Sequence, residues 1–364
     1  MFDILRQFLN RIGQIHSFLD DEEIINELIG NNDIVSGKFK EISNITNLIS
    51  RLRSNKSDRK VQTYVTCIIL LYGLFEQYIE AVLVAYIDVL DSTMSSFNSL
   101  PEKIKSNHTN LSAQLLINRD LDKYRDRCNE SEIIQRMQSC VDDNQFHLNS
   151  LAYTDHRSNF RIESINQFFE PIGISGMSAC IKKCTTFRDY YVKAYPGQPL
   201  DGMKDNIVFE GLNDLAWRRN IVAHGWPDDT LSNELMIERI ELIHIFGQCI
   251  FEVLRQNFLK HFVDQKCHPL PKPLMVINNS IICFHLETGT ITTGDQIIAC
   301  RTNGYFMEGK ISAIEIEHKN IPLISAPPPN DVACLVDFKA KKNYKYFLAN
   351  KETIDRSGEQ VGRH

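Results

Sequence analysis

Apolar residues recur at helical spacing through most of residues 1–264. Two stretches, 61–90 and 231–262, are unusually long. The apolar stripe of the second consists of Leu235, Ile237, Ile240, Ile243, Phe246, Ile250, Val253 and Leu254. Residues three or four positions apart share one face of a helix, so each stretch predicts a long core-facing helix. The pattern predicts shorter helices at about 131–141, 162–170, 176–192 and 205–224, and leaves the polar segment 98–129 ambiguous.

The pattern changes near residue 275. β-Branched residues become frequent, and short Asn- or Gly-containing pairs interrupt them at Asn278-Asn279, Thr288-Gly289, Gly294-Asp295 and Asn303-Gly304. Strand-forming runs between such turns predict a small all-β barrel or sandwich. Prolines at 269, 271 and 273 predict a stiff linker before it.

These changes predict an α+β multidomain protein in which an all-α helical bundle precedes a small all-β barrel. The predicted parts are a helical extension (1–40), a helical bundle (41–264) with an insert (92–160), a linker (265–274), a β-barrel (275–350) and a disordered tail (351–364).

Composition and charge indicate a soluble globular protein, with 43% hydrophobic and 24% charged residues. The net charge of −6 argues against general attraction to nucleic acid but leaves room for a local basic site. The N-terminus lacks the pattern of a signal peptide, and charges within 65–90 favour a buried helix over a membrane span. We therefore expect a cytoplasmic protein without membrane contact.

The ten cysteines are scattered, many within apolar runs, which is typical of reduced, buried thiols. Cys180 and Cys184 are one helical turn apart, but no second pair has matching zinc-ligand spacing. We therefore predict neither a metal site nor a cofactor.

The stretch AWRRNIVAHGWPDD, residues 216–229, gathers polar groups at the end of the predicted 205–224 helix. The glycine and proline after it are residues that end helices, which puts Arg219, Asn220 and His224 in the last two turns. Asn220 and His224 are four residues apart, so the amide can hydrogen-bond the imidazole and orient it. Arg219 lies off that line, but its long side chain can reach round the helix.

Two interpretations fit these residue types. A histidine moves protons near neutral pH and an arginine holds a charged phosphate, so the pair suits phosphoryl chemistry. The same residues can instead cap free carbonyl groups at a helix end, with no chemistry at all. Spacing alone favours capping.

The segment RNIVAH, residues 219–224, resembles the R-x4-6-H motif of HEPN ribonucleases. LLYGLFEQYIEAVL (70–83) before it and LIHIFGQCIFEVL (242–254) after it resemble flanking helices of the HEPN subgroup found beside RNA-ligase/phosphatase repair proteins and of the related cyanobacterial-type proteins. The resemblance covers about residues 40–264, and the insert at 92–160 has no counterpart in it.

The resemblance implies a four- or five-helix up-and-down bundle that forms a homodimer, with two motifs facing each other in one cleft. It implies metal-independent RNA cleavage that leaves a 2′,3′-cyclic phosphate and a 5′-OH. His224 would act as general base or acid, Arg219 would bind the scissile phosphate, and Asn220 would orient His224. Glu76 would be a partner for Arg219, or else a solvent-facing carboxylate.

Two further residues beside the motif have a functional and a structural interpretation. Arg218 would add a phosphate contact or would be a surface arginine. Trp226 would stack on a base, although a buried aromatic residue at a helix end is the more common arrangement.

The β-region resembles the second, β-barrel domain of translational GTPases such as elongation factor Tu. GTITTGDQI (289–297) matches a hairpin and KISAI (310–314) a strand of that domain, and Ala326, Val332 and Val336 take the places of its late strand. This resemblance implies no activity. It suggests docking on RNA, tRNA, the ribosome or a translation factor; the alternative is a generic barrel that serves as a dimer or antitoxin platform.

The basic segment KAKKNYK, residues 339–345, is the one place in the β-region that suits a phosphate backbone. Tyr344 and Tyr346 lie among its lysines, an arrangement that would let a base stack. The sequence favours the simpler explanation, an edge strand protected by lysines.

Two functions therefore remain. The first is a HEPN endoribonuclease that cleaves tRNA, rRNA or mRNA, a toxin or anti-phage effector restrained by an antitoxin or regulatory partner. The alternative is a non-catalytic dimer that binds a nucleotide, RNA or a partner nuclease.

Overall fold

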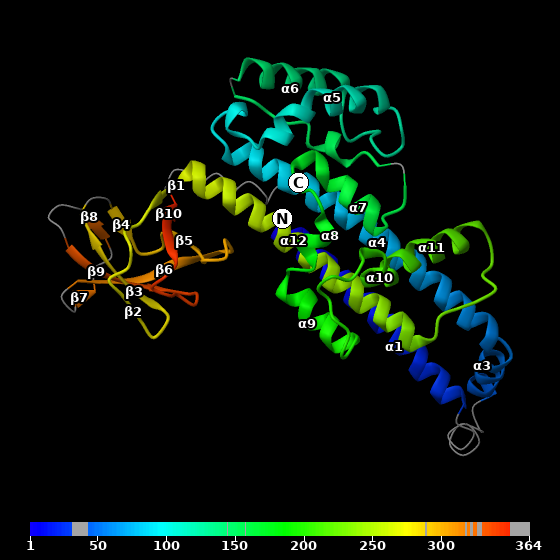
Figure 1. Cartoon of the computed structure of the whole chain (residues 1–364). Coiled ribbons are helices and arrows are strands. Elements are labelled where there is room, and N and C mark those ends of the chain that lie inside the picture. The colour runs from blue at the N-terminus through cyan, green and yellow to red at the C-terminus, as the bar shows by residue number, and fades with distance from the viewer. Residues whose placement is uncertain are drawn as a thin grey trace. The chain divides into compact units, whose positions relative to one another are not determined.

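The computed structural model describes residues 1–30, 43–143, 145–156, 158–287, 290–316, 319–320, 323–325 and 330–349 (Figure 1). The chain forms two compact units, one of residues 1–85 with 150–253 and one of residues 86–149 with 254–364. The two long helices, α4 (Lys56–Thr93) and α12 (Asn233–Lys266), each contribute to both units.

The first unit is helical throughout its described regular structure. Besides its parts of α4 and α12 it contains α1 (Phe2–Gly30), α3 (Ser43–Ser54), α7 (Ile162–Phe169), α8 (Met177–Ile181), α9 (Thr185–Ala194), α10 (Asp205–Val208), α11 (Glu210–His224) and the 3-10 turns Ser150–Thr154 and Glu170–Ile172. The predicted helices are confirmed. Two are interrupted, because 176–192 divides into α8 and α9, and 205–224 divides at Phe209 into α10 and α11.

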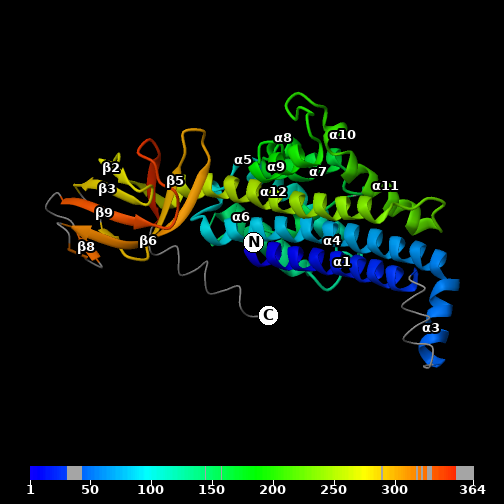
Figure 2. The ribbon, with the colours of Figure 1, turned by 90° about the horizontal axis from the view of Figure 1, so that it is seen from below.

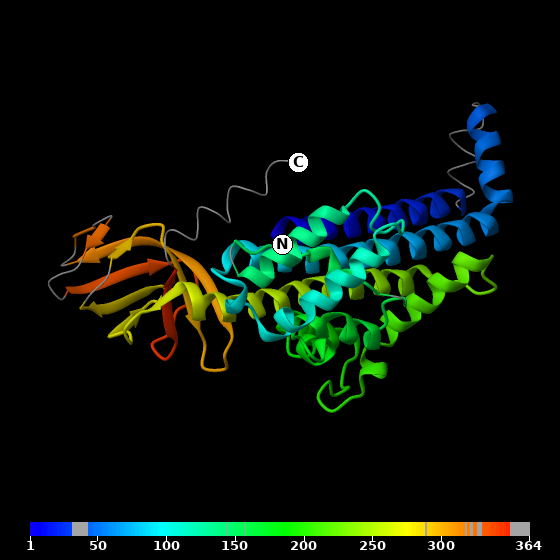
Figure 3. The ribbon, with the colours of Figure 1, turned by 90° about the horizontal axis from the view of Figure 1, so that it is seen from above.

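The core of the first unit lies between α1, α4 and α12, which run side by side (Figures 2 and 3). Phe8 of α1 stacks on Tyr78 of α4 with ring centroids 4.0 Å apart. The buried Tyr78 hydroxyl donates to the carbonyl oxygen of Gly247 in α12 at 2.8 Å. The segment predicted as an N-terminal extension therefore packs into the bundle through α1.

Helix α4 is buried along its apolar face. Cys67, Leu71, Phe75 and Ile79 have no exposed surface. Its length and composition would also suit a membrane span, but half of its most apolar window is buried within the protein. That burial is typical of a core helix.

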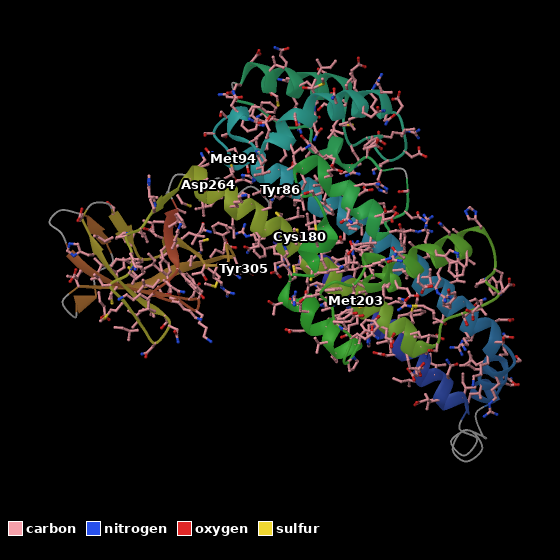
Figure 4. The ribbon with its side chains drawn as sticks, viewed as in Figure 1. Tyr86, Met94, Cys180, Met203, Asp264 and Tyr305 are labelled. Atoms are coloured by element: carbon pink, nitrogen blue, oxygen red, sulfur yellow. The ribbon has the colours of Figure 1, made fainter. Side chains whose placement is uncertain are left out.

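The second unit contains the ambiguous polar segment, and that segment is helical. It forms the 3-10 turn Phe97–Ser99 and α5 (Glu102–Asn118), and α6 (Glu130–Asp142) follows. The buried face of α5 consists of Ile104, His108, Ser112 and Leu115. Because half of these residues are polar, the apolar period in the sequence is weak. In Figure 4, Tyr86 marks the part of α4 that belongs to this unit; its hydroxyl donates to Asn257 Oδ1 at 2.6 Å.

The C-terminal part of the second unit is an antiparallel sheet curled into a half-barrel. The prediction of an all-β part after the helical bundle is therefore confirmed. Its strands are β1 (Cys267–Pro269), β2 (Met275–Ile277), β3 (Ile281–Leu286), β5 (Gln296–Cys300), β6 (Phe306–Ile316), β7 (Lys319–Asn320), β9 (Asn330–Val336) and β10 (Lys345–Ala349). The order is β1-β10-β5-β6-β9-β3-β2, with β7 paired to β6, while β4 (Thr290–Thr292) and β8 (Leu323–Ser325) form a separate pair.

The turns of the sheet follow the sequence where they are described. Asn278 and Asn279 both have positive φ, 50° and 55°, in the tight turn between β2 and β3. Gly294 and Gly304 also have positive φ, 95° and 82°. Thr288-Gly289, Ala326 and the predicted disordered tail lie outside the described residues.

Two expectations for this region were wrong. Residues 265–274 are not simply a linker, because α12 continues to Lys266 and β1 pairs with β10. The lysine-rich segment does not protect an edge strand, because β10 lies between β1 and β5 and is paired on both sides.

Candidate functional site

The motif lies on the last two turns of α11. Leu212, Leu215, Ala216 and Val222 bury one side of this helix. It ends at His224, as predicted. Gly225, which follows the helix, has φ 168°, an extended conformation that any residue can adopt. The helix therefore ends without the glycine in left-handed conformation that follows many helices.

Arg219 lies over the ring of Tyr72 on α4, with its guanidinium carbon 5.5 Å from the ring centroid. Within the part of the chain that the structure describes, no carboxylate pairs with Arg219. Burial, with Glu76 adding to it, raises the pKa of Tyr72 to about 12. The phenol is therefore neutral at physiological pH and does not offset the positive charge of Arg219.

Tyr72 also fixes the backbone beside the motif. Its hydroxyl accepts a hydrogen bond from the buried Phe160 N–H at 2.7 Å. Two residues further on, Ile162 N–H donates to Asn213 Oδ1 of α11 at 3.1 Å. The segment leading into α7 is thereby held to both α4 and α11.

Asn220 takes part in the same arrangement. Its Oδ1 accepts from Asn159 Nδ2 at 2.5 Å. The predicted hydrogen bond from Asn220 to His224 is not among the described contacts; the described hydrogen bond of the Asn220 side chain goes to Asn159. His224 itself is exposed.

Glu76 does not make the predicted ion pair with Arg219 within the described structure. Its carboxylate lies 3.9 Å from His156 Nε2, and Glu80, one turn further along α4, is 2.7 Å from the same nitrogen. The His156 side chain is only 15% exposed and packs on Phe160, with ring centroids 4.4 Å apart. Sequence reasoning missed His156; the only local signal was two glutamates four residues apart on one helix.

Arg218 is largely buried, so its alternative interpretation as a surface arginine was wrong, and its phosphate contact stays a prediction. Its guanidinium hydrogen-bonds Asp214 at 3.0 Å and Tyr64 at 3.0 Å, and its side chain is 12% exposed. Burial alone would lower the pKa of Arg218, but Tyr64 and Asp214 raise it, so the group stays charged. Arg239 shares Asp214 at 3.2 Å.

Trp226 is 63% exposed, so the expectation of a buried aromatic residue at the helix end was wrong. Trp217, on α11 itself, is 50% exposed. Both indoles are therefore accessible to a ligand or to another protein.

A polar pocket of about 500 Å³ opens beside the motif. Asn220 lines it from α11, and residues between 158 and 167 line it from the segment that enters α7. Within the described ranges, no group of three or more His, Cys, Asp or Glu side chains is placed to hold a metal ion. All ten cysteines are free thiols.

Comparison with known proteins identifies the helical part. The family model described as RiboL-PSP-HEPN matches residues 37–256. No curated protein matches the chain significantly. The matched range includes α4, α11 and most of α12, the three helices that carry or flank the motif in the resemblance derived from the sequence. The chain is therefore a member of the RiboL-PSP-HEPN family.

Proposed function

We propose that this protein is a metal-independent endoribonuclease that cleaves cellular RNA to 2′,3′-cyclic phosphate and 5′-OH ends. Membership of the HEPN family supports a nuclease or nucleotide-binding role in general. The observation that carries the finer proposal is Arg219, a half-buried guanidinium with no described carboxylate partner, held over Tyr72 at the end of α11 that also presents His224.

The proposed reaction needs no group beyond these side chains and the RNA. The ribose 2′-oxygen attacks the adjacent phosphorus, forming the 2′-O–P bond while the P–O5′ bond breaks. One proton leaves the 2′-OH and one is delivered to the departing 5′-oxygen. His224 serves as the base or the acid in these transfers, since an imidazole exchanges protons near neutral pH.

Arg219 stabilises the negative charge that gathers on the phosphate oxygens in the transition state. A preoriented cation is most effective when its own charge is not already neutralised, because no existing ion pair has to be broken. Tyr72 supports Arg219 with the face of its ring, an attractive contact that leaves the guanidinium donors available.

The geometry of one helix favours a site completed by a second copy of the chain. Arg219 and His224 are five residues apart, so they point roughly 140° apart around α11. Two protomers facing each other would put the arginine of one beside the histidine of the other. Exposed apolar side chains on the same unit, Trp217 and Trp226 together with Ile69 and Leu70 of α4, are available to such an interface.

The test is cleavage of a labelled pool of tRNA, rRNA and mRNA by purified protein in excess EDTA. We expect cleavage that Arg219→Ala and His224→Ala each abolish without a change in thermal stability. Arg11→Ala and His268→Ala are matched controls, because both residues are exposed and neither side chain has a described hydrogen bond or ion pair. Analytical ultracentrifugation of the same proteins measures the dimer.

Absence of cleavage by a folded, dimeric wild-type protein would contradict the enzymatic proposal. It would favour the alternative, a dimer that binds a nucleotide, RNA or a partner nuclease. The exposed Trp226 beside the motif is the observation that favours this second function.

In the cell, we propose that the cleavage serves as a toxin or anti-phage response in the cytoplasm, restrained by an antitoxin or regulatory partner. The sheet of the second unit would direct it toward tRNA or the ribosome. Lys339, Lys341, Lys342 and Lys345 are exposed together, and β10 beside them is not an edge strand, so edge protection does not account for them. Replacing the four lysines by glutamate should abolish cosedimentation with ribosomes; unchanged cosedimentation would remove this part of the proposal.

A further inference from the structure

The polar pocket beside Asn220 has the size and chemistry of a nucleotide-binding subsite. Its volume of about 500 Å³ lies within the range of ligand pockets. Its lining includes three amide side chains, Asn159, Gln167 and Asn220. Amides carry donors and acceptors together, which is the combination that reads the edges of unpaired bases.

The two asparagines leave hydrogen-bonding groups unused. Their mutual hydrogen bond engages one oxygen of Asn220 and one N–H of Asn159. Among the described residues nothing else bonds these side chains, so one amide oxygen and one NH₂ group remain free. The same result holds if both amides are rotated, because the pair then exchanges roles.

Two charged side chains define which part of a nucleotide fits. Glu163 lines the pocket, is exposed and has no described ion pair. A carboxylate accepts hydrogen bonds and repels phosphate, and it offsets the positive charge of Arg161 in the same lining, so the pocket has no net positive charge to attract phosphate. Arg161, also in the lining, offers a guanidinium plane on which a base can stack.

We propose that this pocket holds the base next to the scissile phosphate and selects bases that carry an exocyclic amino group. Adenine, cytosine and guanine each present such a donor to Glu163. The pairing edge of uracil has one donor, N3–H, flanked by two carbonyl oxygens, and the carboxylate repels these oxygens. Asn220 joins the two sites, since it lines the pocket and directly follows Arg219 in the chain.

The placement of the base next to the scissile phosphate rests on the proposed function, but the test of base selection does not require cleavage. Fluorescein-labelled 2′-O-methyl hexamers of A, C and U lack the attacking 2′-OH, so they report binding alone. Fluorescence anisotropy with the full chain should show A6 and C6 bound roughly fivefold or more tightly than U6. Glu163→Gln should reduce that preference to less than about twofold, because an amide can donate to uracil oxygens.

Glu170→Gln is the matched control, an exposed glutamate just after α7 that does not line the pocket. It should keep the wild-type preference, and both variants should keep the wild-type melting temperature. Equal binding of the three hexamers, or no binding of any, would overturn the base-selecting pocket whatever the cleavage assay shows. Selective binding without cleavage would instead support the pocket and contradict the nuclease.

Discussion

Gly247 of α12 lies where an added methyl group would collide with Phe8 of α1. A Cβ atom built at this position would be 2.2 Å from Phe8 Cε1, 3.0 Å from Cδ1 and 3.1 Å from Cζ. Carbon atoms in contact are normally about 3.5–4.0 Å apart, so the ring would have to move by more than an ångström. Phe8 is only 2% exposed and stacks on Tyr78, so it has little room to move.

The expected cost of Gly247→Ala follows from two opposing effects. Alanine in a helix interior is more favourable than glycine by about 1 kcal/mol. Overpacking a closed core costs about 1–3 kcal/mol. Gly73, in the interior of α4, isolates the first effect because a Cβ there meets no atom within 4 Å. Gly73→Ala should therefore be stabilising. The free energy of unfolding of the Gly247→Ala variant should be lower than that of the Gly73→Ala variant by about 1–3 kcal/mol.

Urea unfolding followed by circular dichroism measures this difference, and hydrogen exchange of α1 locates it. We expect faster amide exchange in α1 for Gly247→Ala and unchanged exchange for Gly73→Ala. Phe8→Leu should remove most of the penalty in the double variant, because contacting residues are energetically coupled. If Gly247→Ala proves as stable as Gly73→Ala and α1 exchanges as in the wild type, the close packing of α1 on α12 is refuted.

Three further predictions concern buried polar groups. Tyr72→Phe leaves the buried Phe160 N–H without its acceptor, so we expect the free energy of unfolding to fall by about 1–3 kcal/mol and amides at 158–161 to exchange faster; an unchanged urea midpoint would contradict this. Burial lowers the pKa of His108 to about 4, against about 6.5 in the unfolded chain, so the unfolded state binds more protons between these values. The free energy of unfolding should then fall by up to about 3 kcal/mol as pH falls from about 6.5 to 4. His108→Gln should flatten this part of a plot of urea midpoint against pH; an equally steep plot for the variant would assign the loss to other groups. Arg218→Ala breaks the hydrogen bonds to Tyr64 and Asp214, so we expect a lower melting temperature, with cleavage retained by the folded fraction. Loss of cleavage at full stability would instead support a phosphate contact by Arg218.

Much of the helical architecture could be predicted because its signals are local. The apolar period fixed the approximate bounds of α4 and α12, and the residues after His224 marked the end of α11. The turn at Asn278-Asn279 was equally readable, since asparagine tolerates positive φ. By contrast, α5 was ambiguous because His108 and Ser112 occupy its buried face and weaken the apolar period.

The sequence by itself determined that Arg219, Asn220 and His224 lie within two turns of one helix, because helical spacing is a local signal. Only the tertiary structure decided what surrounds them. Tyr72 supports Arg219, Asn159 pairs with the amide of Asn220, and the carboxylate of Glu76, which was expected to pair with Arg219, lies beside His156. The same holds for Arg218, whose neighbour Tyr64 comes from another helix. These contacts join positions far apart in the chain, and periodicity, which reports only on neighbours within a few residues, carries no information about them.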